Sequence, residues 1–207
     1  MSKMGSNMPS KWSQDKYIKA YRFAAEAHNG QLVPGTTLPY IVHISLVAME
    51  ITAALAVEPV DNPDLAIQAA LLHDTIEDTD VIYEEIEDLF GTDVADGVLA
   101  LTIDETIGPD SGKFERRWLQ LEDYLRRIKQ QPREIWMVKM ADRITNLQPP
   151  PDHWDGRMIE RYREGAELIY KELGVASAYL GKRLRVKIDG YDAEGLERKM
   201  TQQGEVL

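Results

Sequence analysis

Apolar residues recur every three or four positions along most of this chain, which is the periodicity of an amphipathic α-helix. Residues 13–28 and residues from about 40 to 55 each present one such apolar face. Asn29-Gly30 ends the first segment, and the stretch 33–39 contains two prolines and a glycine, which are typical of a loop. We therefore predict two helices joined by a loop.

Asn62 followed by Pro63 is typical of a helix start, because Asn caps the first turn and Pro is favoured at the first helical position. The apolar run 69–72 follows within the same segment. We expect this helix to be buried and to carry residues 73–78 at its end.

Further helices are predicted along the rest of the chain, at about residues 80–90 (capped by Asp80), 92–103, 113–130, 132–147 and 155–173. The stretch 104–112 is the most loop-like part of the interior. After Gly174 the apolar residues recur every four positions but also alternate, and we favour a helix there. The overall prediction is an all-α, single-domain fold over residues 13–191, between a disordered N-terminal segment (1–12) and a polar C-terminal tail (192–207).

Composition excludes several classes of protein. The 207 residues are 43% hydrophobic and 29% charged, which is ordinary for a globular domain. There is no cysteine, so disulfides and thiolate zinc sites are excluded. A net charge of −11 argues against a nucleic-acid partner, and no apolar run has the length of a membrane span. We expect a cytoplasmic protein without a membrane partner.

Candidate chemistry lies in three separated fragments. They contain a lone His43, the adjacent pair His73-Asp74 and a distant Asp142, although the whole chain has only 4 histidines. On a helix, Glu77 and Asp78 would lie four residues beyond His73 and Asp74, on neighbouring strips of one surface. Burying so many ionisable groups costs several kcal/mol each unless they are paired or bind a metal, and imidazole with carboxylate suits Mn²⁺, Fe²⁺, Zn²⁺ or Mg²⁺.

These fragments sit in longer motifs that resemble a known family. The motifs are Ala-His-Asn-Gly-Gln at 27–31, Pro-Tyr-Ile-Val-His at 39–43, Ala-Ala-Leu-Leu-His-Asp-Thr-Ile-Glu-Asp-Thr at 69–79, Phe-Gly at 90–91 and Val-Lys-Met-Ala-Asp-Arg at 138–143. Over about residues 24–173 the chain resembles the hydrolase half of the Rel/SpoT family, within the HD-domain phosphohydrolases. It is similar to the small stand-alone alarmone hydrolases of that family.

The resemblance implies a reaction and a set of roles. It implies metal-dependent hydrolysis of the 3′-pyrophosphate of guanosine tetra- or pentaphosphate (ppGpp or pppGpp), with release of pyrophosphate. The implied metal ligands are His43, His73, Asp74 and Asp142. Mn²⁺ is the family's usual ion, although another divalent metal is compatible. Glu77 and Asp78 match the acidic pair that handles the attacking water, and Asn146 matches a nucleotide contact.

The chain departs from the family where the nucleotide is recognised. Leu32 follows Gln31 where the family has an Arg, and Gln148-Pro149 replaces a later Arg-Thr. Lys139 and Arg143 flank Asp142 and are candidates to contact the substrate, with a structural salt bridge as the alternative for Arg143. The remaining arginine pairs, such as Arg116-Arg117, are expected on solvated helix faces. Trp118 and Trp154 are expected to be core or loop anchors.

Other functions remain open at this point. Loss of the Arg at position 32 would suit an adenine alarmone, and similar small hydrolases are associated with removal of the 2′-phosphate of NADPH. A different nucleotide phosphohydrolase of the HD type is a further alternative. A non-catalytic nucleotide sensor is disfavoured, because a sensor has no need of Glu77 and Asp78. Self-association into a homo-oligomer is also left open.

Overall fold

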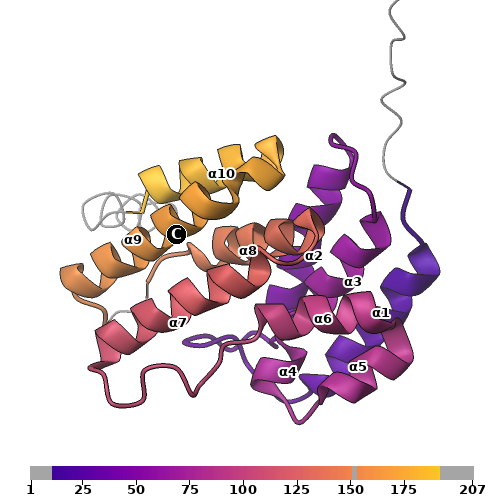
Figure 1. Cartoon of the computed structure of the whole chain (residues 1–207), viewed down its shortest axis with the longest axis horizontal. Coiled ribbons are helices and arrows are strands. Elements are labelled where there is room, and N and C mark those ends of the chain that lie inside the picture. Colours follow the sequence, from indigo (N-terminus) through magenta and orange to yellow (C-terminus); the bar gives the residue numbers. More distant parts are fainter. Residues whose placement is uncertain (1–10, 151–152, 192–207) are drawn as a thin grey trace, which may run out of the picture.

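The fold is a bundle of α-helices (Figure 1). The computed structural model describes residues 11–150 and 153–191. The helices of this part are α1 (Gln14–Ala27), α2 (Ile41–Leu55), α3 (Pro63–Leu72), α4 (Thr75–Asp78), α5 (Tyr83–Phe90), α6 (Thr92–Leu101), α7 (Lys113–Ile128), α8 (Arg133–Asn146), α9 (Gly156–Leu173) and α10 (Ala178–Asp189), with a 3₁₀ turn at Gly174–Ala176. Leu32 and Pro39 form an isolated antiparallel bridge. The predicted all-α fold is confirmed.

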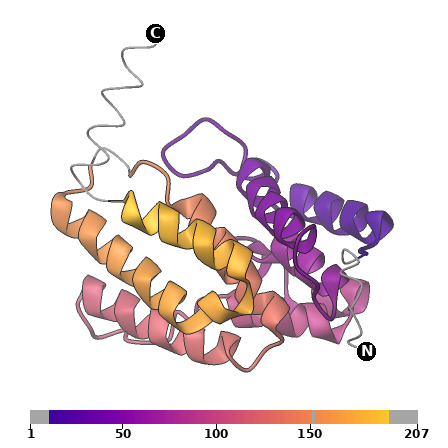
Figure 2. The same cartoon turned by 90° about the horizontal axis from the view of Figure 1, so that it is seen from above.

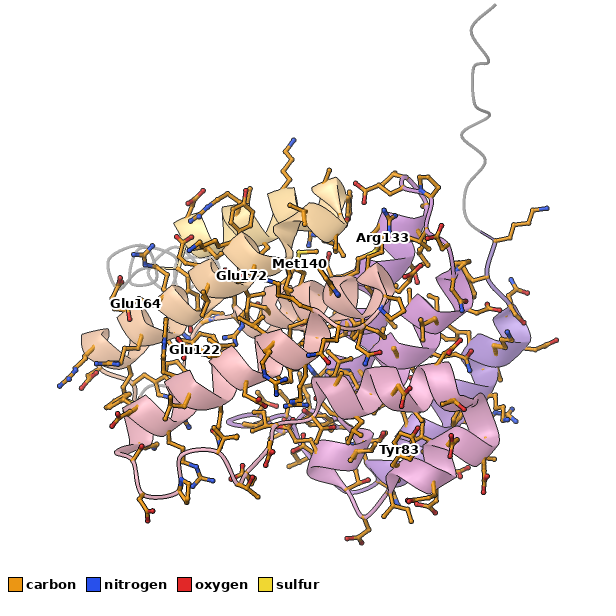
Figure 3. All side chains as sticks on the ribbon, viewed as in Figure 1. Tyr83, Glu122, Arg133, Met140, Glu164 and Glu172 are labelled. Atoms are coloured by element: carbon orange, nitrogen blue, oxygen red, sulfur yellow. The ribbon has the colours of Figure 1, made fainter. Side chains whose placement is uncertain are left out.

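Helix α8 occupies the centre of the bundle. It packs against α2, α3, α9 and α10, so it joins the N-terminal helices to the C-terminal ones (Figures 1 and 2). Its apolar side chains, such as Ile135, Met137 and Met140, are completely buried. Met140 lies inside the molecule, whereas Glu122 and Glu164 project from the helices around it (Figure 3). Side chains on α8 are therefore held by a rigid element.

The start of α3 agrees with the prediction from Asn62-Pro63. The Asn62 side-chain oxygen accepts a hydrogen bond from the Leu65 amide at 3.1 Å, as expected of an N-cap. The Asn62 amide in turn donates to the carboxylate of Glu134, a buried residue of α8, at 2.8 Å. The first turns of α3 and α8 are thus joined, which fixes the helix that leads to His73.

The predicted continuous helix through residue 78 is wrong. Helix α3 ends at Leu72, and α4 begins only at Thr75. The His73 ring hydrogen-bonds the Ala70 carbonyl at 2.9 Å, and the Thr75 hydroxyl donates to the Leu72 carbonyl at 2.7 Å. These are the carbonyls that a continuing helix would use, so side chains compete with the helical hydrogen bonds there.

Two other boundaries also differ from the prediction. Asp80 does not cap α5; the helix begins at Tyr83, and the Glu85 carboxylate accepts from the Ile82 amide at 3.0 Å. Helix α6 ends at Leu101, two residues before the predicted end. Helices α7, α8 and α9 lie close to their predicted bounds.

The choice of helix after Gly174 is confirmed by α10, whose residues Leu180, Leu184 and Ile188 are completely buried. No helix in the described part of the chain is long and apolar enough to span a bilayer. Residues 1–10 of the predicted N-terminal segment and the whole predicted tail lie outside the described residues. The domain bounds 13 and 191 stay predictions.

Candidate functional site

The residues predicted as metal ligands converge from three parts of the fold. His43 lies in the first turn of α2, His73 and Asp74 lie in the turn between α3 and α4, and Asp142 lies on α8. The Nε2 atoms of His43 and His73 are 3.2 Å apart. Asp74 Oδ2 is 3.4 Å from His43 Nε2 and 3.0 Å from His73 Nε2. Asp142 Oδ1 is 3.5 Å from His43 Nε2 and 3.8 Å from His73 Nε2. Segments nearly 100 residues apart thus supply one cluster of donor atoms.

Other groups hold these side chains in place. His73 Nδ1 hydrogen-bonds the Ala70 carbonyl, which directs Nε2 towards the cluster. Asp142 Oδ1 accepts from the Asn146 side chain at 2.5 Å, and Oδ2 accepts from Lys139 Nζ at 2.9 Å. Supporting hydrogen bonds of this kind orient the ligands of metal sites.

Burial and the attraction between opposite charges shift the pKa values of the cluster residues in opposite directions. Burial alone would lower the pKa of His73, but the Asp74 and Asp142 carboxylates raise it to about 9. Burial alone would raise the pKa of Asp74, but the two imidazoles hold it well below its usual range. Lys139 and the imidazoles likewise overcome burial and lower the pKa of Asp142. Without a metal, protonated His73 therefore balances part of the buried negative charge.

The donor set fits a divalent cation. Ligand atoms about 2.0–2.2 Å from a metal lie about 3 Å or slightly more from one another, which is the spacing found here. His43, His73 and Asp74 form a group that could hold an ion, and Asp142 lies within 3.8 Å of both imidazoles. Nitrogen and carboxylate donors without thiols suit the harder transition metals and Zn²⁺.

Glu77 and Asp78 lie on α4 beside this cluster. Glu77 Oε2 accepts from the Ile103 amide at 2.9 Å, which fixes one end of that carboxylate. Burial raises the pKa of Glu77. Burial and the nearby negative charge of Asp74 raise the pKa of Asp78. The structure therefore places both predicted acids next to the cluster, with an increased affinity for protons.

Tyr40 is a site residue to which the sequence prediction gave no role. Its hydroxyl lies 2.7 Å from Asp74 Oδ2 and 3.1 Å from Asp78 Oδ2, so it links a predicted ligand to a predicted acid. Its ring stacks on His28, with centroids 4.8 Å apart. One signal was available in the sequence, because Tyr40 precedes His43 by three residues and so shares its face at the start of α2.

The predicted substrate contacts have different surroundings. Lys139 lies over the Tyr124 ring at 4.3 Å, and the Asp142 carboxylate overcomes burial to raise the pKa of Lys139, which keeps it charged. Arg143 lies over the Tyr162 ring at 4.4 Å, and it forms no ion pair within the described residues, contrary to the salt-bridge alternative. Asn146 supports Asp142 and does not line the adjoining cavity.

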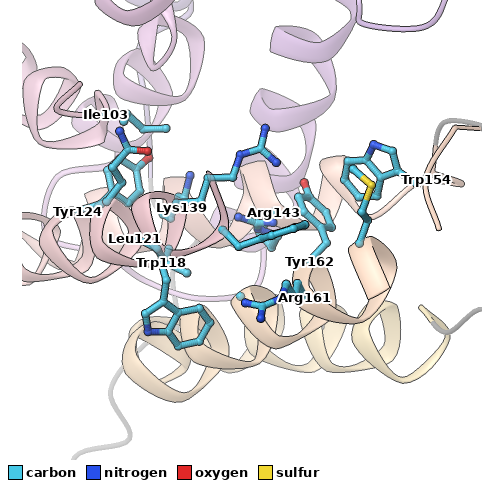
Figure 4. Close-up of a pocket in the computed structure, with 14 residues that line it drawn as sticks. Ile103, Trp118, Leu121, Tyr124, Lys139, Arg143, Trp154, Arg161 and Tyr162 are labelled. Carbon is cyan, nitrogen blue, oxygen red and sulfur yellow. The ribbon is translucent and has the colours of Figure 1, made fainter. Parts of the chain in front are cut away.

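A cavity of about 330 Å³ between α7, α8 and α9 adjoins the cluster (Figure 4). Lys139 and Arg143 line it, and so does Ile103, whose amide holds Glu77. Its volume lies at the small end of the range for ligand pockets, about 300–1,000 Å³. None of the candidate ligands or acids lines the cavity itself. It is connected to them through Lys139, which bonds to Asp142, and through Ile103, whose amide bonds to Glu77.

One cavity-lining residue corrects the sequence-based expectations. Trp118 is an exposed residue of α7 that lines the cavity, so it is neither a core nor a loop anchor. Trp154 packs against the core from the segment before α9 and Arg117 is exposed, as expected, and both also line the cavity. The pattern of α7 contained a signal, because Phe114, Arg117, Trp118, Leu121 and Tyr124 recur at spacings of three and four. That spacing identifies a shared face but does not distinguish a core from a cavity wall.

Comparisons with known proteins agree with this geometry. The HD domain family matches residues 20–176. Guanosine-3′,5′-bis(diphosphate) 3′-pyrophosphohydrolase MESH1 of Danio rerio is 34% identical over 175 residues, covering 81% of this chain and 89% of the relative. The human protein of that name is 33% identical over 178 residues, covering 81% and 90%. A solved structure described as a metazoan ortholog of SpoT that hydrolyses ppGpp has a TM-score of 0.70 and 26% identity, covering 86% of this chain and 97% of that one.

The raised pKa of His73 predicts how the stability of the metal-free protein depends on pH. The group binds its proton more tightly when folded, so its contribution is complete below the unfolded pKa of about 6.5 and is lost as pH rises through about 9. We expect the free energy of unfolding to fall by about 3 kcal/mol between these values. Urea unfolding in the presence of chelator at several pH values measures this free energy. If the free energy of unfolding of His73→Gln fell by the same amount between these pH values, the pH dependence would not come from His73.

The position of Tyr40 predicts a specific effect of removing its hydroxyl. Its hydrogen bond lowers the pKa of Asp78, against burial and Asp74, which raise it. Tyr40→Phe should therefore move the pKa of Asp78 further above its usual range, as measured by carboxyl-carbon NMR titration of the metal-free protein. Tyr83→Phe, which removes a hydroxyl bonded to the exposed Asp96 at 2.8 Å, is the matched control. If the pKa of Asp78 were the same in Tyr40→Phe as in the wild type, the hydrogen bond from Tyr40 to Asp78 would be refuted.

Proposed function

Because the chain belongs to the HD-domain family, and to the group of guanosine-3′,5′-bis(diphosphate) 3′-pyrophosphohydrolases related to MESH1, we propose that it hydrolyses the 3′-pyrophosphate of ppGpp, pppGpp or a related alarmone nucleotide. The observation that carries this proposal is the cluster of His43, His73, Asp74 and Asp142 beside two acids and a cavity. A nucleotide in the cavity would bring a phosphate group to the cluster. We further propose a cytoplasmic location, because such nucleotides are cytoplasmic.

The cluster is proposed to bind one divalent metal, with Mn²⁺ as the ion that the resemblance to the family favours. His43, His73, Asp74 and Asp142 would hold it through two nitrogens and two carboxylates. Such an ion supplies Lewis-acid polarisation of a phosphoryl oxygen and lowers the pKa of water. Binding would also displace the proton that His73 carries in the metal-free protein, since only a neutral imidazole can act as a ligand.

Asp78 and Glu77 are proposed to handle the attacking water. The raised pKa of each carboxylate, caused first by burial, suits a group that must accept a proton near neutral pH. Tyr40 and the Ile103 amide fix the two carboxylates in position. Asp78 would take the proton of the water as its oxygen attacks the phosphorus attached to the ribose 3′ oxygen. The bond from that phosphorus to the 3′ oxygen breaks, the ribose oxygen takes up the proton that Asp78 accepted, and pyrophosphate is released.

Lys139 is proposed to neutralise the pyrophosphate. It lines the cavity and bonds to Asp142 at 2.9 Å, so its ammonium group stands where the cavity meets the cluster. Asp142 and Tyr124 keep the lysine charged despite its burial. A fixed cation in a place with little water stabilises negative charge on the transferred group more strongly than a solvated one.

The proposal is tested by pyrophosphate release from ppGpp by the purified protein, with Mn²⁺ and with chelator. We expect release only with metal. Asp78→Asn and Glu77→Gln should reduce kcat by about 10²–10⁴-fold, the usual contribution of a general base. Glu84→Gln, which removes one charge from an exposed position on the neighbouring α5, should leave kcat unchanged.

The same assay with other substrates separates the alternatives. The adenine counterpart of ppGpp tests whether Leu32, in place of the family Arg, changes the base preference. Phosphate release from NADPH, without pyrophosphate release from either alarmone, would indicate that NADPH is the substrate in place of an alarmone. Metal-dependent binding of ppGpp without any turnover would indicate a sensor.

A further inference from the structure

Helix α6 ends in a way that leaves a backbone amide available to Glu77. The helix ends at Leu101, and the backbone of Thr102 is extended, with a φ of −88° and a ψ of 135°. In a continuing helix the Ile103 amide would donate to the Leu99 carbonyl, four residues earlier. The Ile103 amide donates instead to Glu77 Oε2 at 2.9 Å. The end of α6 therefore supplies a hydrogen bond that fixes one of the two proposed catalytic acids.

Arg127 of α7 binds the carbonyl groups at this helix end. Its Nη1 atom donates to the Leu99 carbonyl at 3.0 Å and to the Ala100 carbonyl at 3.3 Å, and its Nη2 atom donates to the Thr102 carbonyl at 2.8 Å. The Leu99 carbonyl is the group that the Ile103 amide would otherwise use. A guanidinium suits this position because its donors form a rigid planar fork and because positive charge is favourable at a helix C-terminus. Arg127 therefore stabilises the point at which the chain leaves the helix.

The peptide group between Thr102 and Ile103 is hydrogen-bonded on both sides. Its carbonyl accepts from Arg127, and its N–H donates to Glu77. Both bonds have a charged partner, and bonds of this kind are about twice as strong as neutral ones. Positive charge at the carbonyl also polarises the peptide group, which makes its N–H a better donor. Arg127 and Glu77 lie on different helices but are thus linked through a single peptide group.

The Arg127 side chain is itself held in one orientation. Its Nε atom donates to Asp123 Oδ2 at 2.8 Å, and its guanidinium lies 5.7 Å from the centre of the Tyr124 ring. The side chain is 23% exposed, whereas that of the adjacent Arg126 is 63% exposed. Arg126 bonds to the other oxygen of Asp123, and within the described part of the chain it forms no hydrogen bond with α6. The two neighbouring arginines therefore share an acid but differ in their contact with the end of α6.

We propose that Arg127 is a positioning residue for the reaction, which directs the Glu77 carboxylate towards the attacking water through the peptide group between Thr102 and Ile103. This inference rests on the proposed function, in which Glu77 handles that water. Orientation matters because a displacement of about 1 Å can lower a reaction rate about 10²-fold. Arg127 does not line the cavity, so its loss should alter the geometry of the acid and leave the substrate contacts in place.

The first experiment compares the hydrolysis of ppGpp by Arg127→Ala and Arg126→Ala. Arg127→Ala should lower kcat about 10- to 100-fold and keep KM within about twofold of the wild type, since the carboxylate is retained but misdirected. Arg126→Ala is the matched control, because it removes an arginine from the same helix and from the same acid, and it should change neither constant. Val98→Ala, which removes buried apolar contacts of α6, controls for lost stability and should keep the wild-type kcat.

A second variant keeps the test decisive if Arg127→Ala does not fold. Arg127→Lys retains the positive charge at the end of α6 but lacks the planar fork that holds several carbonyls together. It should therefore fold and should also lower kcat without raising KM. A wild-type kcat in Arg127→Lys, together with no loss in Arg127→Ala where that variant folds, would overturn the proposal.

The route through Glu77 is tested by combining variants. If Arg127 acts through that carboxylate, Arg127→Ala should lower kcat no further when Glu77→Gln is already present, by the logic of a double-mutant cycle. A merely structural role would lower kcat by the same factor in both backgrounds. An equal loss in the two backgrounds would therefore overturn the proposal.

The NMR resonance of the Ile103 amide proton gives a readout that does not depend on turnover. In the metal-free protein, Glu77→Gln removes the charge that this amide contacts and should move its resonance. The movement should be smaller when Arg127→Ala is present than in the wild type or with Arg126→Ala. The Ile82 amide, which bonds to a glutamate carboxylate of α5 at 3.0 Å, is the control resonance and should not move.

This readout separates a failure of the inference from a failure of the proposed function. If the wild type does not hydrolyse ppGpp, the proposed reaction fails, and the Ile103 resonance alone decides whether Arg127 positions Glu77. A smaller movement with Arg127→Ala supports the positioning role, and an equal movement in all three backgrounds overturns it.

Discussion

The attraction between two buried imidazoles and two carboxylates, Asp142 buried and Asp74 partly buried, is the interaction on which the candidate site depends. Each of these groups would destabilise the fold by several kcal/mol if it were buried alone and charged. Together they offset one another, since Asp74 and Asp142 raise the pKa of His73 while the imidazoles lower the pKa of both carboxylates. A divalent cation would replace the proton on His73 and would bring a larger positive charge to the two carboxylates, which is why the cluster suits a metal.

Helix α8 contributes residues both to the cluster of candidate metal ligands and to the cavity proposed to bind the substrate. Lys139, Asp142 and Arg143 occupy positions i, i+3 and i+4, so one helical turn presents a candidate ligand to the cluster and two cations to the cavity. The same helix packs against α2 and α3, which carry or lead to the two histidines, and against α9, which forms another cavity wall. The cluster and the cavity are therefore fixed relative to each other by the packing of one buried helix.

The periodicity of the sequence predicted most helices because it reports burial, which is a local property of each segment. It missed the break at His73 because that break results from side chains of His73 and Thr75 that hydrogen-bond backbone carbonyls. The motifs predicted the residues of the cluster, whose convergence the structure describes. The sequence places Tyr40 on the face of His43 and several α7 residues on one shared face, but it does not show what these faces contact. The hydrogen bonds of Tyr40 and the cavity depend on contacts between segments that are distant in sequence.

We propose above all that His43, His73, Asp74 and Asp142 enclose a single divalent metal. Crystals grown with Mn²⁺ and measured at the manganese absorption edge test it directly, because an anomalous difference map locates the ion without reference to activity. We expect one strong peak within about 2.0–2.4 Å of His43 Nε2, His73 Nε2 and an oxygen of each carboxylate. A cluster without a peak at saturating Mn²⁺, or a peak bound elsewhere, would contradict it.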